Sequence, residues 1–230
     1  MSAIAIVPST PVLVPELGGA AAAELADLGA AVLAAAALLP PRWVVVGAGP
    51  SDDVVGPDGI GTFAGLGADV RVRLSPRAGD PAELAVEWPV CALLAAWVRG
   101  QARPQASAQV RVYCSDHDAD AALARGRQLR TEIDQQPDPV GVLIVADGAN
   151  TLTPDAPGGY DHGAADVQLA LDDALASGDV AALTRLPGQI LGRVAFQVLA
   201  GLTGQGPRTA KELYRGAPYG VGYFAGAWQP

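Results

Sequence analysis

Residues 140–145, with the sequence VGVLIV, lead without polar alternation into residues 147–162, DGANTLTPDAPGGYDH. An uninterrupted apolar run of this length is typical of a strand that is buried on both faces of a sheet. The second stretch is rich in Pro, Gly and Asp, which favour tight turns. We therefore expect a long loop at the carboxyl end of a central strand, where α/β folds build their sites.

Strand-like apolar runs and helical patterns alternate along the rest of the chain. The expected strands are residues 4–7, 43–46, 70–74, 110–114, 140–145 and 221–225. The expected helices are residues 20–37, 82–98, 119–133, 164–176 and 190–202, with a kink or break at Pro89. This order predicts an α/β fold, with a mostly parallel or mixed central sheet sandwiched by helices, in one domain over residues 1–230.

The composition argues against several classes of partner. There are 15 Lys and Arg against 24 Asp and Glu, which gives a formal net charge of −9 at pH 7. A chain without a basic surplus is a poor partner for nucleic acid or for an anionic membrane surface. Two cysteines are too few for a disulfide framework, and no segment predicts a signal peptide or a membrane span. We therefore expect a cytoplasmic protein.

A possible dinucleotide-binding turn occurs at residues 47–49, where Gly-Ala-Gly follows an apolar strand. Such a turn needs a third glycine at position 52 and a helix directly after it. Position 52 is Asp52, and the residues around it favour a turn. The pattern therefore gives little support to a dinucleotide site.

Possible metal ligands gather at residues 114–118, CSDHD, which close one expected strand and open a helix. Thiol, imidazole and carboxylate groups all bind divalent metals, and His162 is the one other histidine of the chain. The structural alternative is that Ser115 or Asp116 caps the helix. In the same way, His162 is either a ligand or a turn residue, and its loop is either structural or a pre-organised site.

Residues 152–161, LTPDAPGGYD, closely resemble a motif of the class III extradiol ring-cleaving dioxygenase B-subunit superfamily, the LigB-type family with its Memo-like branch. Residues 8–18, PSTPVLVPELG, are similar to the opening Pro-His-Pro-Pro segment of that family. The strand end at residues 46–49, the helix around Gly192 and residues 217–224 follow in the order of the family. The resemblance covers nearly the whole chain, and it implies the family's α/β fold.

In such enzymes two histidines and a glutamate hold Fe(II), and a further histidine acts as an acid and base. At the matching positions this chain has Ser9, Gly49 and, near Gly192, Ile190, while Asn150 stands in place of the catalytic histidine. Glycine and isoleucine offer no ligand atom, serine is a poor Fe(II) ligand, and an amide does not shuttle a proton near neutral pH. The resemblance thus implies a pocket with no bound metal, lined by Ser9, Thr10, Gly49, Asn150, Asp155, Tyr160 and Ile190.

Two functions stay open from the sequence. The first is a non-catalytic member of the superfamily, without a cofactor, that binds a small molecule or a protein partner at the former active-site mouth, which includes Asn150 and Asp147. The alternative is an active oxidoreductase or metalloenzyme with Fe(II) or another divalent metal in a rewired site. Its candidate residues are His117, His162, Cys114, Asp116 and Asp147. Aromatic residues between positions 219 and 228 also suggest a homo-oligomer interface, with core packing as the alternative.

Overall fold

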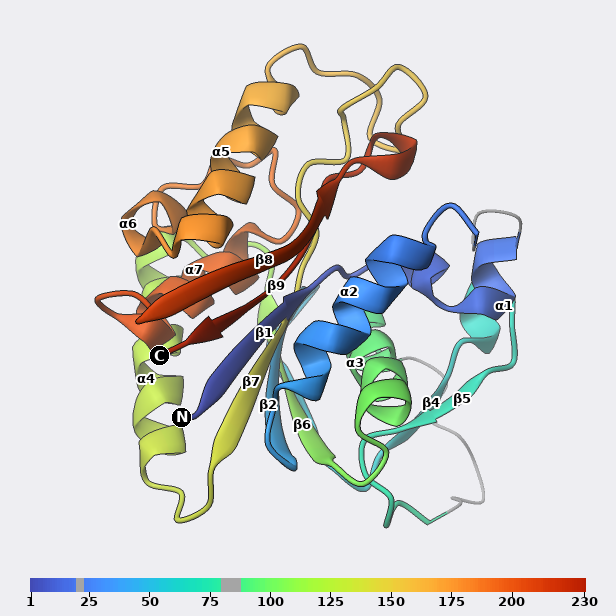
Figure 1. Ribbon diagram of the computed structural model, residues 1–230, viewed down its shortest axis with the longest axis vertical. Helices are drawn as coiled ribbons and strands as arrows, with labels where there is room; N and C mark the ends of the chain where they lie inside the picture. The colour runs from blue at the N-terminus through green and yellow to red at the C-terminus, as the bar shows by residue number, and fades with distance from the viewer. Residues whose placement is uncertain (20–22, 80–87) are drawn as a thin grey trace.

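The computed structural model describes residues 1–19, 23–79 and 88–230. Within these residues seven strands form one sheet in the order β3-β6-β2-β7-β1-β9-β8 (Figure 1). The strands are β1 (Ala3–Val7), β2 (Arg42–Gly49), β3 (Asp53–Val55), β6 (Ser107–Cys114), β7 (Val140–Val145), β8 (Thr209–Gly216) and β9 (Tyr223–Gln229). Strands β6, β2, β7 and β1 run parallel, and β3, β9 and β8 pair antiparallel with their neighbours. The fold is therefore α/β with a mixed central sheet.

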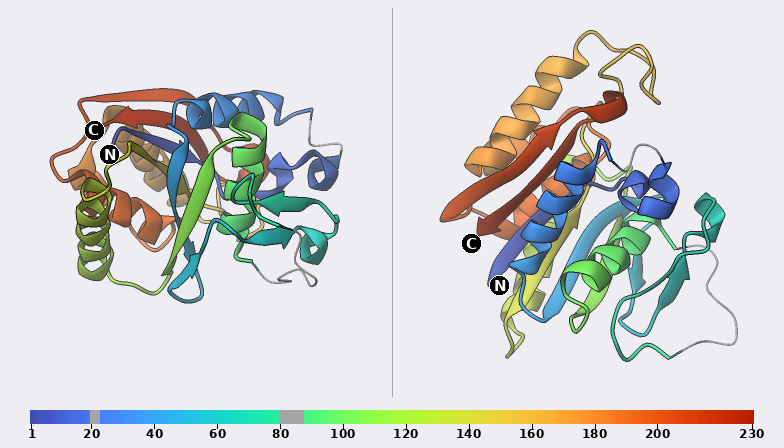
Figure 2. Two further views of the ribbon diagram at one scale, coloured as in Figure 1. Left: turned by 90° about the horizontal axis from the view of Figure 1, so that it is seen from below. Right: turned by 45° about the vertical axis from the view of Figure 1, so that its right-hand side comes forward.

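Helices cover both faces of this sheet (Figures 1 and 2). One face carries α2 (Ala26–Ala37) and α3 (Val90–Ala102), and the other carries α4 (Ala119–Asp134), α5 (Ala164–Ser177) and α7 (Arg193–Thr203). The short helices are α1 (Pro15–Gly18) and α6 (Val180–Leu183). Along β1, Ala5 and Val7 belong to the core under α2 and α3, whereas Ile4 and Ile6 belong to the core on the other face. The strand is apolar throughout because its alternating side chains meet a helical layer on each side.

Helices α4 and α7 approach each other at two glycines. A Cβ atom on Gly126 would lie 2.1 Å from the carbonyl oxygen of Val198, and one on Gly201 would lie 2.2 Å from that of Leu123. Backbone therefore touches backbone at this crossing, and neither position has room for a methyl group. The close contact seats α4 and α7 against the same face of the sheet.

The strand predictions were right for the central sheet and incomplete at its edges. Residues 70–74 do not join the main sheet: β5 (Arg71–Arg73) pairs only with β4 (Ile60–Thr62) in a separate two-stranded sheet. The last strand is β9, which starts two residues later than predicted and extends to Gln229. Strand β8 was missed because its sequence, TAKELYRG, is that of a half-exposed edge strand.

Three helix predictions need correction. Of the kink or break predicted at Pro89, the structure shows the break: Pro89 is the N-cap residue of α3, so the helix begins at Val90 and not at residue 82. The predicted helical residues 82–87 and 20–22 lie outside the described residues, and α2 begins at Ala26 because residues 23–25 form a turn. The last helix was predicted to begin at residue 190 but begins three residues later, at Arg193, because residue 190 pairs with Ala149 in a β-bridge. In the described part of the chain no helix has both the length and the apolarity to span a membrane.

We predict that Gly126→Ala destabilises the fold by about 2 kcal/mol, because the added methyl group forces α4 away from α7. The measurement is urea denaturation followed by circular dichroism. The matched control is Gly100→Ala in α3, where an added Cβ has nothing within 4 Å and should stabilise the helix by about 0.5–1 kcal/mol. Equal effects of the two substitutions would contradict the proposed helix contact.

Candidate functional site

The candidate site lies at the carboxyl ends of the parallel strands, in the middle of the sheet; below, 'this edge' means this end of the strands. Val7 is in register with Val145, and Val46 is in register with Ile144, so the segments that follow β1, β2 and β7 leave the sheet side by side. The chain after β1 leads to α2 on one face, and the chain after β7 leads to α5 on the opposite face. Adjacent parallel strands whose connections leave in opposite directions form a switch point, where α/β folds typically bind their ligands. The strand-end region made by the residues that follow β1 and β7 is called the crevice below.

Asp147 is the ionisable group in this crevice. One of its carboxylate oxygens, Oδ1, accepts a hydrogen bond of 2.7 Å from the backbone N–H of Ser9. Burial raises the pKa of the Asp147 carboxyl to about 7, although the Ser9 hydrogen bond acts in the opposite direction. A carboxyl group with this pKa can hold or release a proton near neutral pH.

A pair of hydroxyl groups lies on the β1 and β9 side of the crevice. The Thr10 Oγ1 and the Tyr223 hydroxyl are 3.0 Å apart, and both residues are buried. Burial, with a smaller contribution from the nearby Asp147 carboxylate, raises the pKa of Tyr223 to about 12, although the Thr10 hydrogen bond acts in the opposite direction. Tyr223 therefore keeps its proton at neutral pH and offers a neutral phenol beside the carboxyl group.

A buried glutamine holds the backbone that follows Asp147. The Gln168 Oε1 accepts a 2.8 Å hydrogen bond from the Ala149 N–H, and its Nε2 donates one of 2.8 Å to Asp172. Its amide lies between Gly148 and Gly222, where a Cβ atom would approach Oε1 to 2.0 Å and 2.1 Å. Burial also raises the pKa of Asp172 to about 6. Sequence reasoning missed Gln168 and Asp172, although their i,i+4 spacing on the inner face of α5 was a signal.

The residues predicted to line a pocket differ in their environments: some side chains are buried in the packing, others are exposed, and Gly49 contributes only backbone groups. Asn150 packs its side-chain amide against Gly158, where a Cβ atom would be 2.5 Å from Oδ1. Ile190, bridged to Ala149, is buried in the core, so its side chain is part of the packing and not an exposed wall. Asp155 and Tyr160 are exposed, and the Tyr160 ring meets His162 edge-on with 4.6 Å between ring centroids. Gly49 accepts hydrogen bonds at its carbonyl from the Ser115 N–H and Oγ.

This set of residues does not fit an Fe(II) site. Ser9 approaches Asp147 through its backbone, Gly49 has no side chain, and Ile190 is a buried hydrocarbon. Among the described residues there is no group of three or more His, Cys, Asp or Glu that is arranged to hold a metal ion. The 2-His-1-carboxylate arrangement therefore has no counterpart here.

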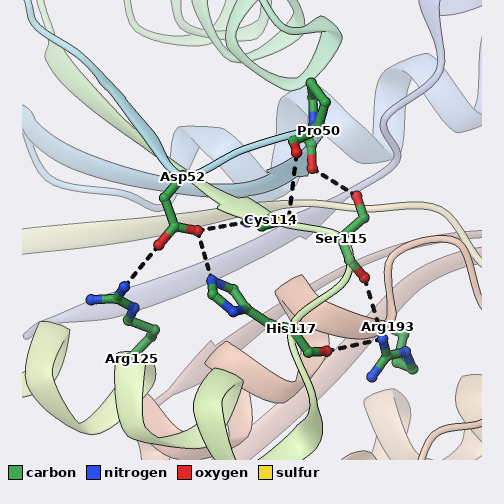
Figure 3. Close-up of polar contacts among 8 residues, drawn as sticks. Pro50, Asp52, Cys114, Ser115, His117, Arg125 and Arg193 are labelled. Atoms are coloured by element: carbon green, nitrogen blue, oxygen red, sulfur yellow. Dashed lines mark hydrogen bonds and ion pairs between the residues drawn. The ribbon is translucent and has the colours of Figure 1, made fainter.

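Cys114 and His117, two residues of the alternative metal site, lie in a network of polar contacts at the ends of β2 and β6 (Figure 3). His117 Nε2 is 2.7 Å from Asp52 Oδ1, and Arg125 pairs with the second oxygen of Asp52 at 2.8 Å. The Cys114 N–H also donates to Asp52, so His117 and the strand end share one carboxylate. The hydrogen bonds and cationic charges lower the pKa of Asp52, against the effect of its own burial.

The predicted grouping of His117 with Cys114, Asp116 and His162 therefore needs correction. His117 pairs with Asp52, whereas Asp116 is exposed and His162 lies against Tyr160. The helix cap was also wrong, because Asp118, and not Ser115 or Asp116, accepts from the Ala121 N–H at the start of α4. Arg193 of α7 donates to the carbonyl oxygens of Ser115 and His117, so the turn is held as a structural unit.

Comparison with known proteins supports the fold alone. No protein-family model matches the chain, and no curated protein matches its sequence. The structure is similar to the crystal structure of an uncharacterized protein from Escherichia coli K12, with a TM-score of 0.60 and 10% sequence identity. The similarity covers 99% of this chain and 100% of that chain. At this identity it establishes a common α/β architecture and leaves the activity to be argued from the site.

We predict that Asp147→Asn stabilises the protein at pH 8 by an amount on the order of 2 kcal/mol, because it removes a buried charge and keeps an acceptor for the Ser9 N–H. The folded-state pKa of about 7 lies above the ordinary value of 3.8, so the stability of the wild-type protein falls as pH rises between these values. The advantage of the variant should therefore disappear toward pH 4.

Denaturant titrations across this pH range test the prediction. Asp155→Asn, in the same loop but exposed, is the matched control and should follow the wild-type curve. A constant difference between Asp147→Asn and wild type at all pH values would mean that the Asp147 carboxyl has no raised pKa.

Proposed function

We propose that this chain is a class III extradiol dioxygenase-like protein without the Fe(II) ring-cleavage site, and that it binds a small molecule in the crevice between β1 and β7. The proposal is supported by two features at the carboxyl ends of the parallel strands: how the chain segments are arranged there, and which side chains stand at the ligand positions of the family. Ser9 and Asn150 follow the neighbouring strands β1 and β7, and Gly49 ends β2, the other neighbour of β7. The described residues include no group of three or more His, Cys, Asp or Glu arranged to hold a metal ion.

The side chains at this end of the strands can bind a ligand and can hold or release a proton. Asp147 is a partly buried carboxyl group beside the buried hydroxyls of Thr10 and Tyr223. Gln168 fixes the backbone of the loop after Asp147, which keeps the acid in place before a ligand arrives. Such a pre-organised crevice with a few polar groups is typical of a small-molecule site.

We predict that the purified protein, incubated anaerobically with Fe(II) and then desalted, retains much less than one iron per chain, because Gly49 and Ile190 offer no ligand atom and Ser9 offers only a poor one. With catechol and oxygen added, no ring-cleavage product should absorb in the visible or near-ultraviolet range. Elemental analysis measures the iron. Stoichiometric iron together with catechol cleavage would refute the proposal.

The second candidate function is a rewired metal or acid–base site around His117, and one observation favours it. Asp52 binds His117 Nε2, and a carboxylate partner of this kind orients an imidazole and sets its tautomer. The network is also compatible with a structural turn, since Arg125 of α4 pairs with Asp52 and Arg193 of α7 donates to the carbonyl oxygen of His117.

Substitution of both histidines separates these readings. If the structural reading holds, His117→Ala and His162→Ala leave metal content and any turnover unchanged, and His117→Ala costs about 1–2 kcal/mol of stability because Asp52 loses a charge-assisted hydrogen bond. His162→Ala, which loses only an exposed ring contact, is the control and should cost less than about 0.5 kcal/mol. Loss of bound metal in either variant would establish the rewired site.

A further inference from the structure

The Asp147 carboxyl has an unusual environment for a charged group at a strand end. Its Oδ1 is bonded to the Ser9 N–H, while its Oδ2 has no hydrogen-bond partner among the described residues. That second oxygen is not fully buried. In the described chain, the fully buried side-chain nitrogen and oxygen atoms without a hydrogen-bond partner are Arg111 Nε and Thr151 Oγ1. Asp147 thus keeps one acceptor oxygen that has no protein partner and is not fully buried.

No cation of the described chain neutralises this group. The ion pairs formed by Arg and His side chains in the described residues all involve other acids, and nothing of opposite charge contributes to the electrostatics of Asp147. The other side chains near Asp147, the Thr10 hydroxyl and the Tyr223 phenol, are uncharged, and each can accept a hydrogen bond as well as donate one. Carboxylates removed from water are normally paired with a cation or hydrogen-bonded at both oxygens.

We propose that the crevice takes a ligand with an ammonium group, which pairs with the free oxygen of Asp147. This inference rests on the proposed small-molecule function and names the ligand class of that site. An ammonium has three N–H donors and no acceptor, which matches an edge where an unpaired carboxylate oxygen lies beside hydroxyl groups. The formal net charge of −9 also favours the approach of a cation over that of an anion.

The same geometry gives the binding a defined pH dependence. The ammonium pairs with the ionised carboxylate, so affinity rises as pH increases through the Asp147 pKa of about 7. The titratable group that faces Asp147 from a neighbouring strand is Tyr223 of β9, and its pKa of about 12 keeps it neutral over this range. The segment that follows β1 contributes the uncharged Ser9 and Thr10. Gly192, which precedes α7, donates its backbone N–H to the Asp147 carbonyl oxygen.

The test uses benzylamine as the probe and benzyl alcohol as its neutral counterpart of equal size. Binding to the 230-residue protein is followed through the backbone amide signal of Ser9 in NMR spectra at pH 8 and pH 5. We expect benzylamine to bind at least about tenfold more tightly than benzyl alcohol at pH 8, the effect of one charge-assisted hydrogen bond, and to lose most of this preference at pH 5. Calorimetry in two buffers at pH 7 should show proton release when the amine binds.

Asp147→Asn should abolish the preference for the amine, and Asp155→Asn, in the same loop, should retain it. Equal binding of the two probes, or a preference that persists in Asp147→Asn, overturns the ammonium assignment and leaves a neutral small-molecule site in place. A Ser9 signal that neither probe shifts at about 10 mM also overturns it. Iron-dependent catechol cleavage would instead refute the proposed function, independently of the result for benzylamine binding. The proton-release measurement uses only wild-type protein, so it decides the question even if Asp147→Asn does not fold.

Discussion

The parallel pairing of β1 with β7 is the constraint on which the candidate site depends. The two strands are in register from Ala3 with Gly141 to Val7 with Val145, and the Ala146 N–H continues the ladder to the Val7 carbonyl. This pairing places the residues after each strand next to each other, which brings the Ser9 N–H to the Asp147 carboxylate. Because helices cover both faces, the strand edge is the place where polar groups can reach solvent.

The loop after β7 is explained by packing more than by chemistry. A Cβ atom at Gly158 would meet the Asn150 amide, and Gly159 has a positive φ of 83°, where a side chain is strained. Ala156 packs against Gly220, next to Tyr219, which itself adopts the left-handed region at φ 57°. The residues that give this loop its resemblance to the LigB-type motif therefore have structural roles that do not require a metal. A scaffold of this kind can persist without the donor atoms of an iron site.

The layered architecture could be predicted because it follows from local patterns. Strands such as Val140–Val145 are apolar on both faces, and helices such as α4 and α5 have a clear apolar stripe, so both were found within a few residues of their ends. Strand β8 could not be found in this way, because an edge strand gains hydrogen bonds from the hairpin with β9 and not from burial.

The site was less predictable from the sequence, because the state of its residues depends on contacts between distant parts of the chain. The position of Asp147 at a strand end followed from the sequence, but its state depends on contacts made across the fold, with Ser9 138 residues away. Gln168 was missed because a buried amide between Gly148 and Gly222 looks, in the sequence, like an ordinary polar helix residue. His117 was seen, yet its partner Asp52 lies 65 residues away and was interpreted as a turn residue.

The energetics of Asp147 connect stability with function at this edge. An amide at the same position would still accept the Ser9 hydrogen bond, and it would avoid the cost of a buried charge. The acid therefore weakens the fold near neutral pH and provides a charge that forms only when the group deprotonates. By linkage, a cation that binds this carboxylate must also lower its pKa, so ligand binding and proton release are two measures of one interaction. The cost in stability and the preference for a cation therefore have a single physical origin, the desolvation of one carboxyl group between β1 and β7.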